Sequence, residues 1–243
     1  MVKNNKLRVV YFDIETSALR GYYYGKKWET NIIKTDRQDI LLSIAWKVKG
    51  EKKIYVKSLA DYPNYRRNKL FDMALVKDLH ALFSTTDVLI AFNGDRFDIR
   101  KANNFFIRNG LKPVSVFKTI DPLKIARKHF DFTSNSLNDL AEMFGIGSKI
   151  DNDKDLSFKC LNGDLGAWRK MKLYNAHDVH LLEQVFLKLA PWANLTQIEK
   201  QEESSVCLVC RGRLVKDGHK MRVSGKRQIY RCVQCGHCSN RSA

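Results

Sequence analysis

Two carboxylates stand at the end of the first strand-like segment. Residues 7–14 are mostly apolar and β-branched. Asp13 lies near the end of this segment, and Glu15 follows it directly. Because side chains alternate along a strand, residues two apart lie on the same face. Two such carboxylates repel each other unless a cation lies between them, and hard oxygen ligands suit Mg²⁺ or Mn²⁺. The spacing indicates a cation site, although a pair of solvated acids is the simpler interpretation of this motif alone.

A third acid, Asp98, follows Asn93-Gly94. The glycine allows a sharp turn after a short strand, and Asp98 then stands at the start of an expected helix. Aspartate is a preferred helix N-cap. Taken alone, the spacing favours that capping role over a catalytic one.

Tyr174 and Asp178 lie on a long expected helix. Residues four apart share a helix face, so the two side chains project together. A solvated polar stripe produces the same pattern. His177 is one residue off that face, and a structural role is expected for it.

Together and in this order, the three motifs resemble those of the DEDD (DnaQ-like) 3′–5′ exonucleases, tyrosine subtype, and in particular the proofreading domain of family B DNA polymerases. The resemblance covers residues 6–190 and includes the connecting stretches Asp121–Arg127 and Ser136-Leu137. The motifs are Asp13-Ile14-Glu15, Asn93-Gly94-x-x-Phe97-Asp98 and Tyr174-x-x-x-Asp178. It implies an α/β fold of the ribonuclease H-like type, with a mixed five-stranded sheet flanked by helices.

The resemblance also implies a role for each matching residue. Asp13 would contact both ions of a site for two Mg²⁺ or Mn²⁺, Glu15 and Asp178 would complete one coordination shell, and Asp98 would support the second ion. Tyr174 would orient the attacking water rather than remove its proton, because an unperturbed tyrosine has a pKa of about 10. The residues expected to contact substrate are Thr16, Asn93 and Phe97.

An aromatic and basic segment, Tyr22–Trp28, follows the first acidic motif. Single-stranded nucleic acids bind through base stacking and phosphate neutralisation. The composition therefore predicts a substrate wall that includes Tyr23, Lys27 and Trp28. The alternative is that the aromatic rings fold back to cover the sheet.

Five of the six cysteines lie in residues 206–243. The pairs Cys207-x-x-Cys210 and Cys232-x-x-Cys235 flank 21 residues, a spacing typical of a four-cysteine zinc site. We expect one structural Zn²⁺ in a module that resembles a zinc ribbon, because so small a module needs a metal to hold its fold. The identity of the last zinc ligand is left open by His237 and Cys238, since the spacing Cys235-x-x-Cys238 is also permitted. Gly212 and Gly236 follow the two pairs, as tight turns around a metal require.

The motifs divide the chain into a nuclease-like domain (1–194), a polar linker (195–205) and the zinc ribbon (206–243). Hydrophobic periodicity and turn residues define the elements that carry the motifs. Expected strands are 7–14, 40–48, 53–58 and 88–92 in the first domain, with 214–215 and 228–230 in the ribbon. Expected helices are 69–83, 99–109, 137–144 and 165–189.

The formal net charge of the 243-residue chain is +17, which points to a polyanionic partner. The last 38 residues carry nine Lys or Arg and one Asp, so +8 of that charge belongs to the ribbon. The longest apolar run, 40–48, is too short to cross a bilayer. The acids at 13 and 15 interrupt any signal-peptide pattern. A cytoplasmic protein with no membrane partner is therefore expected.

The resulting hypothesis is a metal-dependent 3′–5′ exonuclease that hydrolyses phosphodiester bonds at single-stranded 3′ ends. DNA is favoured over RNA as the substrate, and repair or replication is the expected process. A replication or repair protein is a candidate partner of the ribbon. Two alternatives are a ribonuclease H-like endonuclease with a zinc ribbon, either transposon-encoded or junction-cutting, and a non-catalytic nucleic-acid adaptor. The motif Tyr174-x-x-x-Asp178 argues for the exonuclease, and the four intact carboxylates argue against the adaptor.

Overall fold

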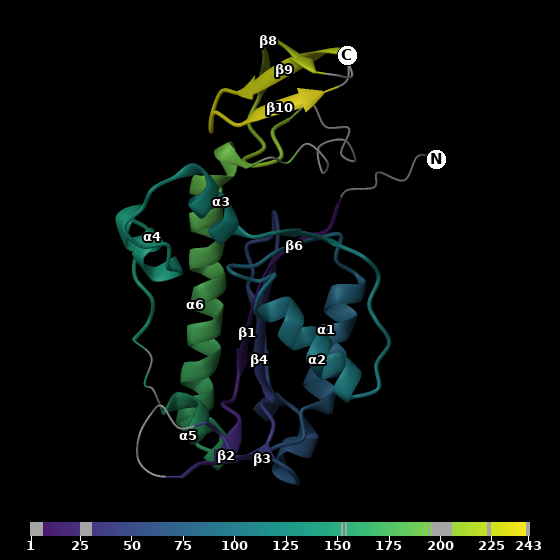
Figure 1. Ribbon diagram of the computed structural model, residues 1–243, viewed down its shortest axis with the longest axis vertical. Coiled ribbons are helices and arrows are strands. Elements are labelled where there is room, and N and C mark those ends of the chain that lie inside the picture. Colours follow the sequence, from purple (N-terminus) through teal and green to yellow (C-terminus); the bar gives the residue numbers. More distant parts are fainter. Residues whose placement is uncertain are drawn as a thin grey trace.

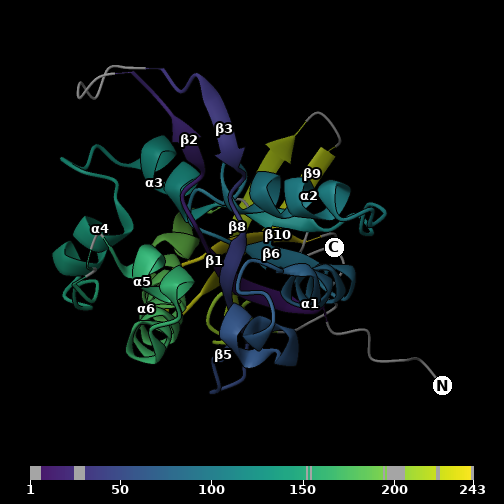
Figure 2. The ribbon, with the colours of Figure 1, turned by 90° about the horizontal axis from the view of Figure 1, so that it is seen from below.

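A mixed five-stranded sheet forms the centre of the molecule (Figures 1 and 2). The computed structural model describes residues 7–24, 31–151, 153, 155–193, 195, 206–222 and 225–241. The sheet order is β5-β4-β1-β6-β7, with β1 antiparallel to β4 and parallel to β6. This confirms the predicted ribonuclease H-like sheet. The strands are β1 (Val9–Thr16), β4 (Leu41–Val48), β5 (Tyr55–Ser58), β6 (Val88–Ile90) and β7 (Lys118–Ile120).

The central strand β1 is buried on both faces, as its run of apolar residues predicts. Val10, Phe12 and Ile14 pack on the side of helices α1 (Met73–Ser84) and α2 (Asp98–Arg108). Tyr11 packs on the opposite side, edge-on against Phe186 of the long helix α6 (Leu165–Leu189). Because side chains alternate along the strand, Asp13 and Glu15 fall on the same side as Tyr11, which is the side of α6.

Helix α6 begins and ends where local chemistry predicts. The Asp164 side chain accepts hydrogen bonds from the N–H groups of Gly166 and Ala167, which caps the N-terminus. The helix ends just before Pro191, which lies in the short 3₁₀ turn η3 (Ala190–Trp192). Helix α4 (Leu137–Met143) likewise begins at Ser136, whose hydroxyl accepts from the Asp139 N–H. The helix predicted at 69–83 begins later, after the 3₁₀ turns η1 (Leu59–Asp61) and η2 (Pro63–Arg66).

The structure contains elements that the periodicity did not indicate. Helix α3 (Pro122–His129) is capped by Asp121, whose side chain accepts from Leu123 N–H. Helix α5 (Leu156–Asn162) is short and lies in a stretch rich in Asp and Lys. The interval 20–39 holds a hairpin of β2 (Arg20–Tyr22) and β3 (Lys34–Arg37), whose side chains are mostly exposed and so carry no apolar alternation.

The C-terminal residues form a three-stranded antiparallel sheet at the end of the molecule beyond the C-terminus of α6 (Figure 1). Its strands are β8 (Leu214–Arg222), β9 (Gly225–Cys232) and β10 (Cys238–Arg241). They are longer and more numerous than the two short strands that were predicted. Within the described ranges, none of the helices has the length and hydropathy needed to cross a membrane.

Candidate active site and four-cysteine centre

Three carboxylates from two elements converge beside the end of β1. Asp13 and Glu15 come from β1, and Asp178 comes from the facing side of α6. One oxygen of each lies within 4.8 Å of an oxygen of the other two. Tyr174, one turn earlier on α6, is 9% exposed and belongs to the same face. The residues expected from two distant motifs are therefore neighbours in space.

Asp98 is linked to the site by a hydrogen bond with the backbone of β1. It is the first residue of α2 and is 3% exposed, and its Oδ1 accepts a hydrogen bond from Ile14 N–H at 3.3 Å. The N-cap position belongs to Phe97 and has no side-chain capping bond, so the capping interpretation is wrong. The turn before α2 has Asn93 at φ 58°. A Cβ on Gly94 would lie 2.3 Å from that of Ala91, so glycine is required there.

Asp98 and Asp178 are buried, Asp13 and Glu15 are half-buried, and the four acids repel one another. Burial raises the pKa of Asp13 well above its ordinary value, and the charges of the other three acids raise it further. Burial, followed by the charge of Asp178, raises the pKa of Glu15 to about 7. Burial raises the pKa of Asp98 to about 7, even though two backbone N–H groups favour its charged form. Buried carboxylates of this kind are stable when ionised only if a cation compensates them.

Lys149 supplies part of that positive charge, and the sequence analysis did not find it. Its Nζ lies 2.5 Å from Asp178 Oδ2 and 3.4 Å from the Tyr174 hydroxyl. Although burial opposes its charged form, the charge of Asp178 keeps the pKa of Lys149 above its ordinary value. Lys149 lies in the loop after α4, and no local spacing links it to the acidic motifs.

The loop that carries Lys149 is fixed on both sides. The Lys149 N–H donates to Asn138 Oδ1 at 2.7 Å, and His177 Nε2 lies 2.8 Å from the carbonyl oxygen of Ser148. The structural role expected for His177 is therefore to hold this loop against α6. The two contacts place the ammonium group of Lys149 at the acids.

Asn175 is a second residue that the motifs did not single out. It is fully buried, its Nδ2 donates to Asp13 Oδ2 at 2.6 Å, and its Oδ1 accepts from the Ser43 hydroxyl at 2.7 Å. Because the amide is held by Ser43 on β4, it fixes the orientation of the Asp13 carboxylate. Its position directly after Tyr174 is the signal that could have identified it.

An open cleft of about 720 Å³ lies next to the acids and is lined by Asn93, Arg127, Ser136 and Lys149, among others. Lys149 joins the cleft to the acids through its ion pair with Asp178, and Asn93, expected to contact substrate, also lines the cleft. Of the other residues expected to contact substrate, Thr16 follows a β-bulge at the end of β1. Phe97 is 42% exposed, with Lys101 Nζ over its ring at 5.9 Å.

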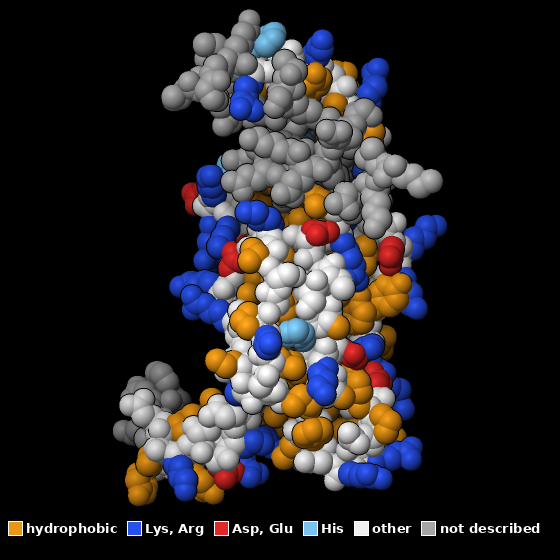
Figure 3. Space-filling view, turned by 90° about the vertical axis from the view of Figure 1, so that its right-hand side faces the viewer, with side chains coloured by type: hydrophobic (Ala, Val, Ile, Leu, Met, Phe, Trp, Pro, Cys, Tyr) orange, Lys and Arg blue, Asp and Glu red, His pale blue; other side chains and the backbone are white. Residues whose placement is uncertain are grey.

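The β2–β3 hairpin protrudes from the body of the protein (Figure 2) and presents hydrophobic and basic side chains (Figure 3). The side chains of Tyr22, Tyr23 and Tyr24 are 61%, 59% and 81% exposed, so these rings do not fold back onto the sheet. Lys27 and Trp28, which were predicted as substrate contacts, lie outside the described residues.

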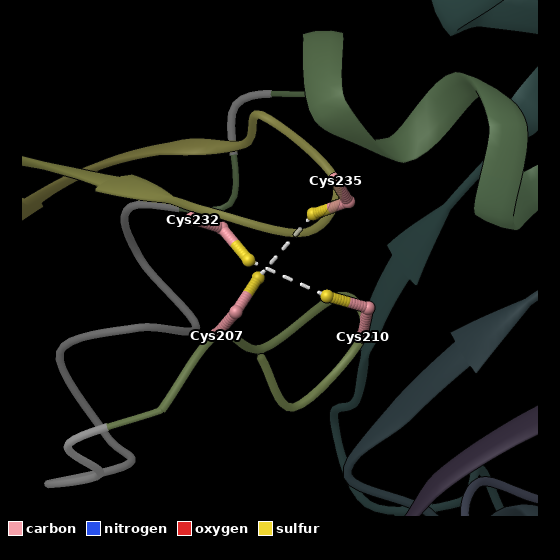
Figure 4. A group of neighbouring side chains, drawn as sticks. All are labelled: Cys207, Cys210, Cys232 and Cys235. Carbon is pink, nitrogen blue, oxygen red and sulfur yellow. Dashed lines mark hydrogen bonds between the residues drawn. The ribbon is translucent and has the colours of Figure 1, made fainter. Parts of the chain in front are cut away.

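The four predicted zinc cysteines point toward one another (Figure 4). The sulfurs of Cys207 and Cys235 are 3.7 Å apart and those of Cys210 and Cys232 are 3.4 Å apart, and all four lie within 4.8 Å of one another. These separations are far longer than the disulfide bond of about 2.05 Å, and none of the four cysteines is disulfide-bonded. Four thiolates about 2.3 Å from one tetrahedral ion would be separated by distances close to those observed.

The two cysteine pairs sit on matching turns. The carbonyl oxygen of Cys207 accepts from Arg211 N–H and that of Cys232 accepts from Gly236 N–H. Arg211 and Gly236 have φ of 65° and 74°. Gly212 was expected as a turn glycine, but it is required because the Cys232 sulfur packs against it. A Cβ at this position would lie 2.9 Å from Cys232 Sγ.

The alternative zinc ligands lie outside the gathered group. Cys238 is exposed, and its sulfur faces the carbonyl oxygen of Gly236 at 3.7 Å. His237 is 1% exposed, and its Nδ1 faces the carbonyl oxygen of Pro191 at 3.4 Å. The geometry favours Cys235 as the fourth ligand.

Comparison with known proteins agrees with this fold. A search of curated proteins finds no significant match. The solved structure of the family B DNA polymerase from the hyperthermophilic archaeon Pyrobaculum calidifontis is similar, with a TM-score of 0.53 and 18% identity. The similarity covers 76% of this chain and 25% of the polymerase, so the chain spans about a quarter of that protein's length. The model of the RNase H superfamily matches residues 10–190, and the chain therefore belongs to that superfamily.

Proposed function

We propose that the protein is a metal-dependent 3′–5′ exonuclease that acts on single-stranded 3′ ends, with DNA favoured over RNA as the substrate. The observation that carries the proposal is the convergence of Asp13, Glu15 and Asp178 with the hydroxyl of Tyr174. The motif order of the tyrosine-type exonucleases supports this activity and polarity. The similarity to a DNA polymerase supports DNA as the polymer.

The donor set fits divalent Mg²⁺ or Mn²⁺. All four acids offer hard oxygen ligands, and among the described residues Asp178 Oδ1 is buried without a hydrogen-bond partner. Asp13, Glu15 and Asp178 would hold one ion, and Asp13 with Asp98 would hold the second. Such ions stabilise negative charge on the attacking and leaving oxygens and lower the pKa of the attacking water.

The protein's own groups position the reactants. Burial, followed by the charge of Asp178, raises the pKa of Tyr174, so its hydroxyl stays protonated at neutral pH and orients water as a hydrogen-bond partner. Asn175 holds the Asp13 carboxylate in one orientation. The ammonium group of Lys149 contacts Asp178 and Lys149 also lines the cleft, so the group can form an ion pair with a substrate phosphate.

The substrate strand is proposed to follow the cleft beside Lys149. Asn93 and Ser136 line this cleft, and the partly exposed ring of Phe97 offers a stacking surface near the acids. The exposed tyrosines of the β2–β3 hairpin, Tyr23 among them, would hold more distant nucleotides. Thr16, at the bulge that ends β1, would contact the terminal nucleotide.

The direct test is digestion of single strands labelled at the 5′ or the 3′ end, as DNA and as RNA, with Mg²⁺, Mn²⁺ or neither. A 3′–5′ exonuclease releases a 3′ label as mononucleotide at once and shortens a 5′-labelled strand stepwise. Cleavage of a circular single strand would instead identify an endonuclease. Binding without any digestion would support the adaptor.

Lys149→Met tests whether the ammonium group competes with the metal ions for the acids. The variant should bind Mn²⁺ about fivefold more tightly or better, because a repulsion of about 1 kcal/mol corresponds to about that factor. Isothermal titration calorimetry with Mn²⁺ measures this. Lys124→Met is the matched control, since it breaks an exposed pair with Asp95. Unchanged or weaker Mn²⁺ binding by Lys149→Met would rule out the competition.

We further propose that Cys207, Cys210, Cys232 and Cys235 hold one structural Zn²⁺. Four sulfur ligands leave no open coordination position, as expected of a structural rather than a catalytic site. The Val209 N–H donates to Cys207 Sγ at 3.3 Å, and such a hydrogen bond favours the thiolate form that binds metal. With Zn²⁺ bound, the ribbon keeps a positive charge that suits nucleic acid or an acidic replication or repair protein.

A further inference from the structure

The first turn of the four-cysteine centre lies inside the core of the nuclease domain. Cys207, Leu208 and Val209 are 1%, 5% and 2% exposed. Cys207 and Val209 belong to the same buried cluster as Val9 of β1 and Phe186 of α6. A folded zinc ribbon joined by a free tether would instead keep an exposed surface on all sides.

The contact extends over both the sheet and its covering helix. Leu208 faces a narrow space lined by Val9 and Val88, where β1 and β6 begin, and by Leu195 after α6. A cavity beside this contact is lined by Val209 of the first turn together with Val9, Tyr11 and Leu187.

The second turn contacts the end of α6. Cys232 is 1% exposed and lies in the same cluster as Ala190 and Ala193, which follow α6. The buried ring of His237 faces the carbonyl oxygen of Pro191. The two cysteine turns together close one end of the nuclease domain.

This end is separated along β1 and α6 from the candidate active site. The ribbon stands where β1 begins, whereas Asp13 and Glu15 lie toward its other end (Figure 1). Along helix α6, Tyr174 and Asp178 lie in the middle part, whereas Phe186 lies near the end that the ribbon contacts. The ribbon therefore packs against β1 and α6, two of the three elements that carry the acids.

From these contacts we propose that the four-cysteine Zn²⁺ site is a structural centre of the nuclease domain, and that loss of Zn²⁺ loosens β1, β6 and the last turns of α6. The proposal rests on the zinc site proposed above and is independent of nuclease activity. Small zinc modules fold only with their metal, because the ligands that the ion holds together have no sufficient core of their own. If the ribbon unfolds, the apolar side chains of Val9, Val88 and Phe186 lose their cover and meet water.

Hydrogen exchange on the full chain tests this coupling. The zinc-loaded protein, with zinc content measured by mass spectrometry, is compared with protein stripped by a strong zinc chelator. We expect amides of residues 9–12, 88–90 and 182–190 to exchange at least about tenfold faster after stripping, which corresponds to about 1.4 kcal/mol of local opening. Faster exchange confined to residues 206–241 would overturn the coupling and leave a tethered module.

Two variants and one control separate the effect of the metal from that of the contact. Cys232→Ser should lose zinc and reproduce the faster exchange, whereas Cys238→Ser, which changes an exposed cysteine outside the group, should change neither. Leu208→Ser keeps all four thiols and should speed exchange in β1 and β6 while zinc stays bound. Full protection in Leu208→Ser would contradict the proposal, and a wild-type chain that takes up no zinc would remove its basis. Neither result depends on whether the protein cleaves nucleic acid.

Discussion

Asp13→Asn should reduce phosphodiester hydrolysis by about a thousandfold or more at saturating Mn²⁺ without unfolding the protein. Asp13 is the carboxylate that lies among all the other acids, and it is expected to contact both ions. Losing about 4 kcal/mol of charge stabilisation in the transition state corresponds to about three powers of ten in rate. Single-turnover digestion of a 3′-labelled strand measures the change.

The same substitution should not destabilise the metal-free protein. The amide of asparagine keeps an oxygen that can accept from Asn175, and it removes one of four mutually repelling charges. We therefore expect a thermal midpoint equal to or above that of the wild type in metal-free buffer. Asp131→Asn, at an exposed position, is the matched control and should retain full activity. A wild-type rate in Asp13→Asn would show that the site has been assigned wrongly.

The metal-free protein should lose stability as the pH rises from about 5 to 8, and Mg²⁺ or Mn²⁺ should restore it. Burial and like charge raise the pKa of Glu15 and of Asp98 to about 7 in the folded state, whereas unfolded carboxyl groups titrate near about 4. Between these values the folded state binds more protons than the unfolded state, so stability falls with rising pH. Above this range the acids are ionised and need a cation.

Thermal unfolding at pH 5.5 and pH 8 measures this linkage. The rise in midpoint caused by Mn²⁺ should be larger at pH 8, by about 3 °C or more, since about 1 kcal/mol shifts the midpoint of a chain of this size by about 2–4 °C. Buffers freed of metal by resin rather than by a strong chelator leave the proposed zinc in place. Glu15→Gln should reduce the pH dependence of the Mn²⁺ effect. An equal effect of Mn²⁺ at both pH values would contradict the raised pKa values.

Much of the fold could be predicted from local patterns. The buried strand that became β1 and the helix from Leu165 to Leu189 follow from apolar runs, from periodicity and from Pro191. Helix α4 is equally short and was found from its Ser136 cap, whereas α5 lacks a side-chain cap and was missed. Helix α3 was also missed, although its Asp121-Pro122 cap was visible in the sequence. The β2–β3 hairpin was missed because its exposed strands bury too little to create an alternating pattern.

The sequence by itself determined which residues share a face within one element: Asp13 with Glu15 on a strand, and Tyr174 with Asp178 on a helix. It also determined the paired cysteine turns, because the spacing within each pair is local. Only the tertiary structure decided that Lys149 pairs with Asp178, that the Asp98 side chain accepts from the Ile14 N–H of β1, and that Cys207 and Val209 share a buried cluster with β1 and α6. These contacts join residues far apart in the chain. Strand and helix periodicity sets the direction of a side chain on its own element, and the packing of elements sets which side chains meet.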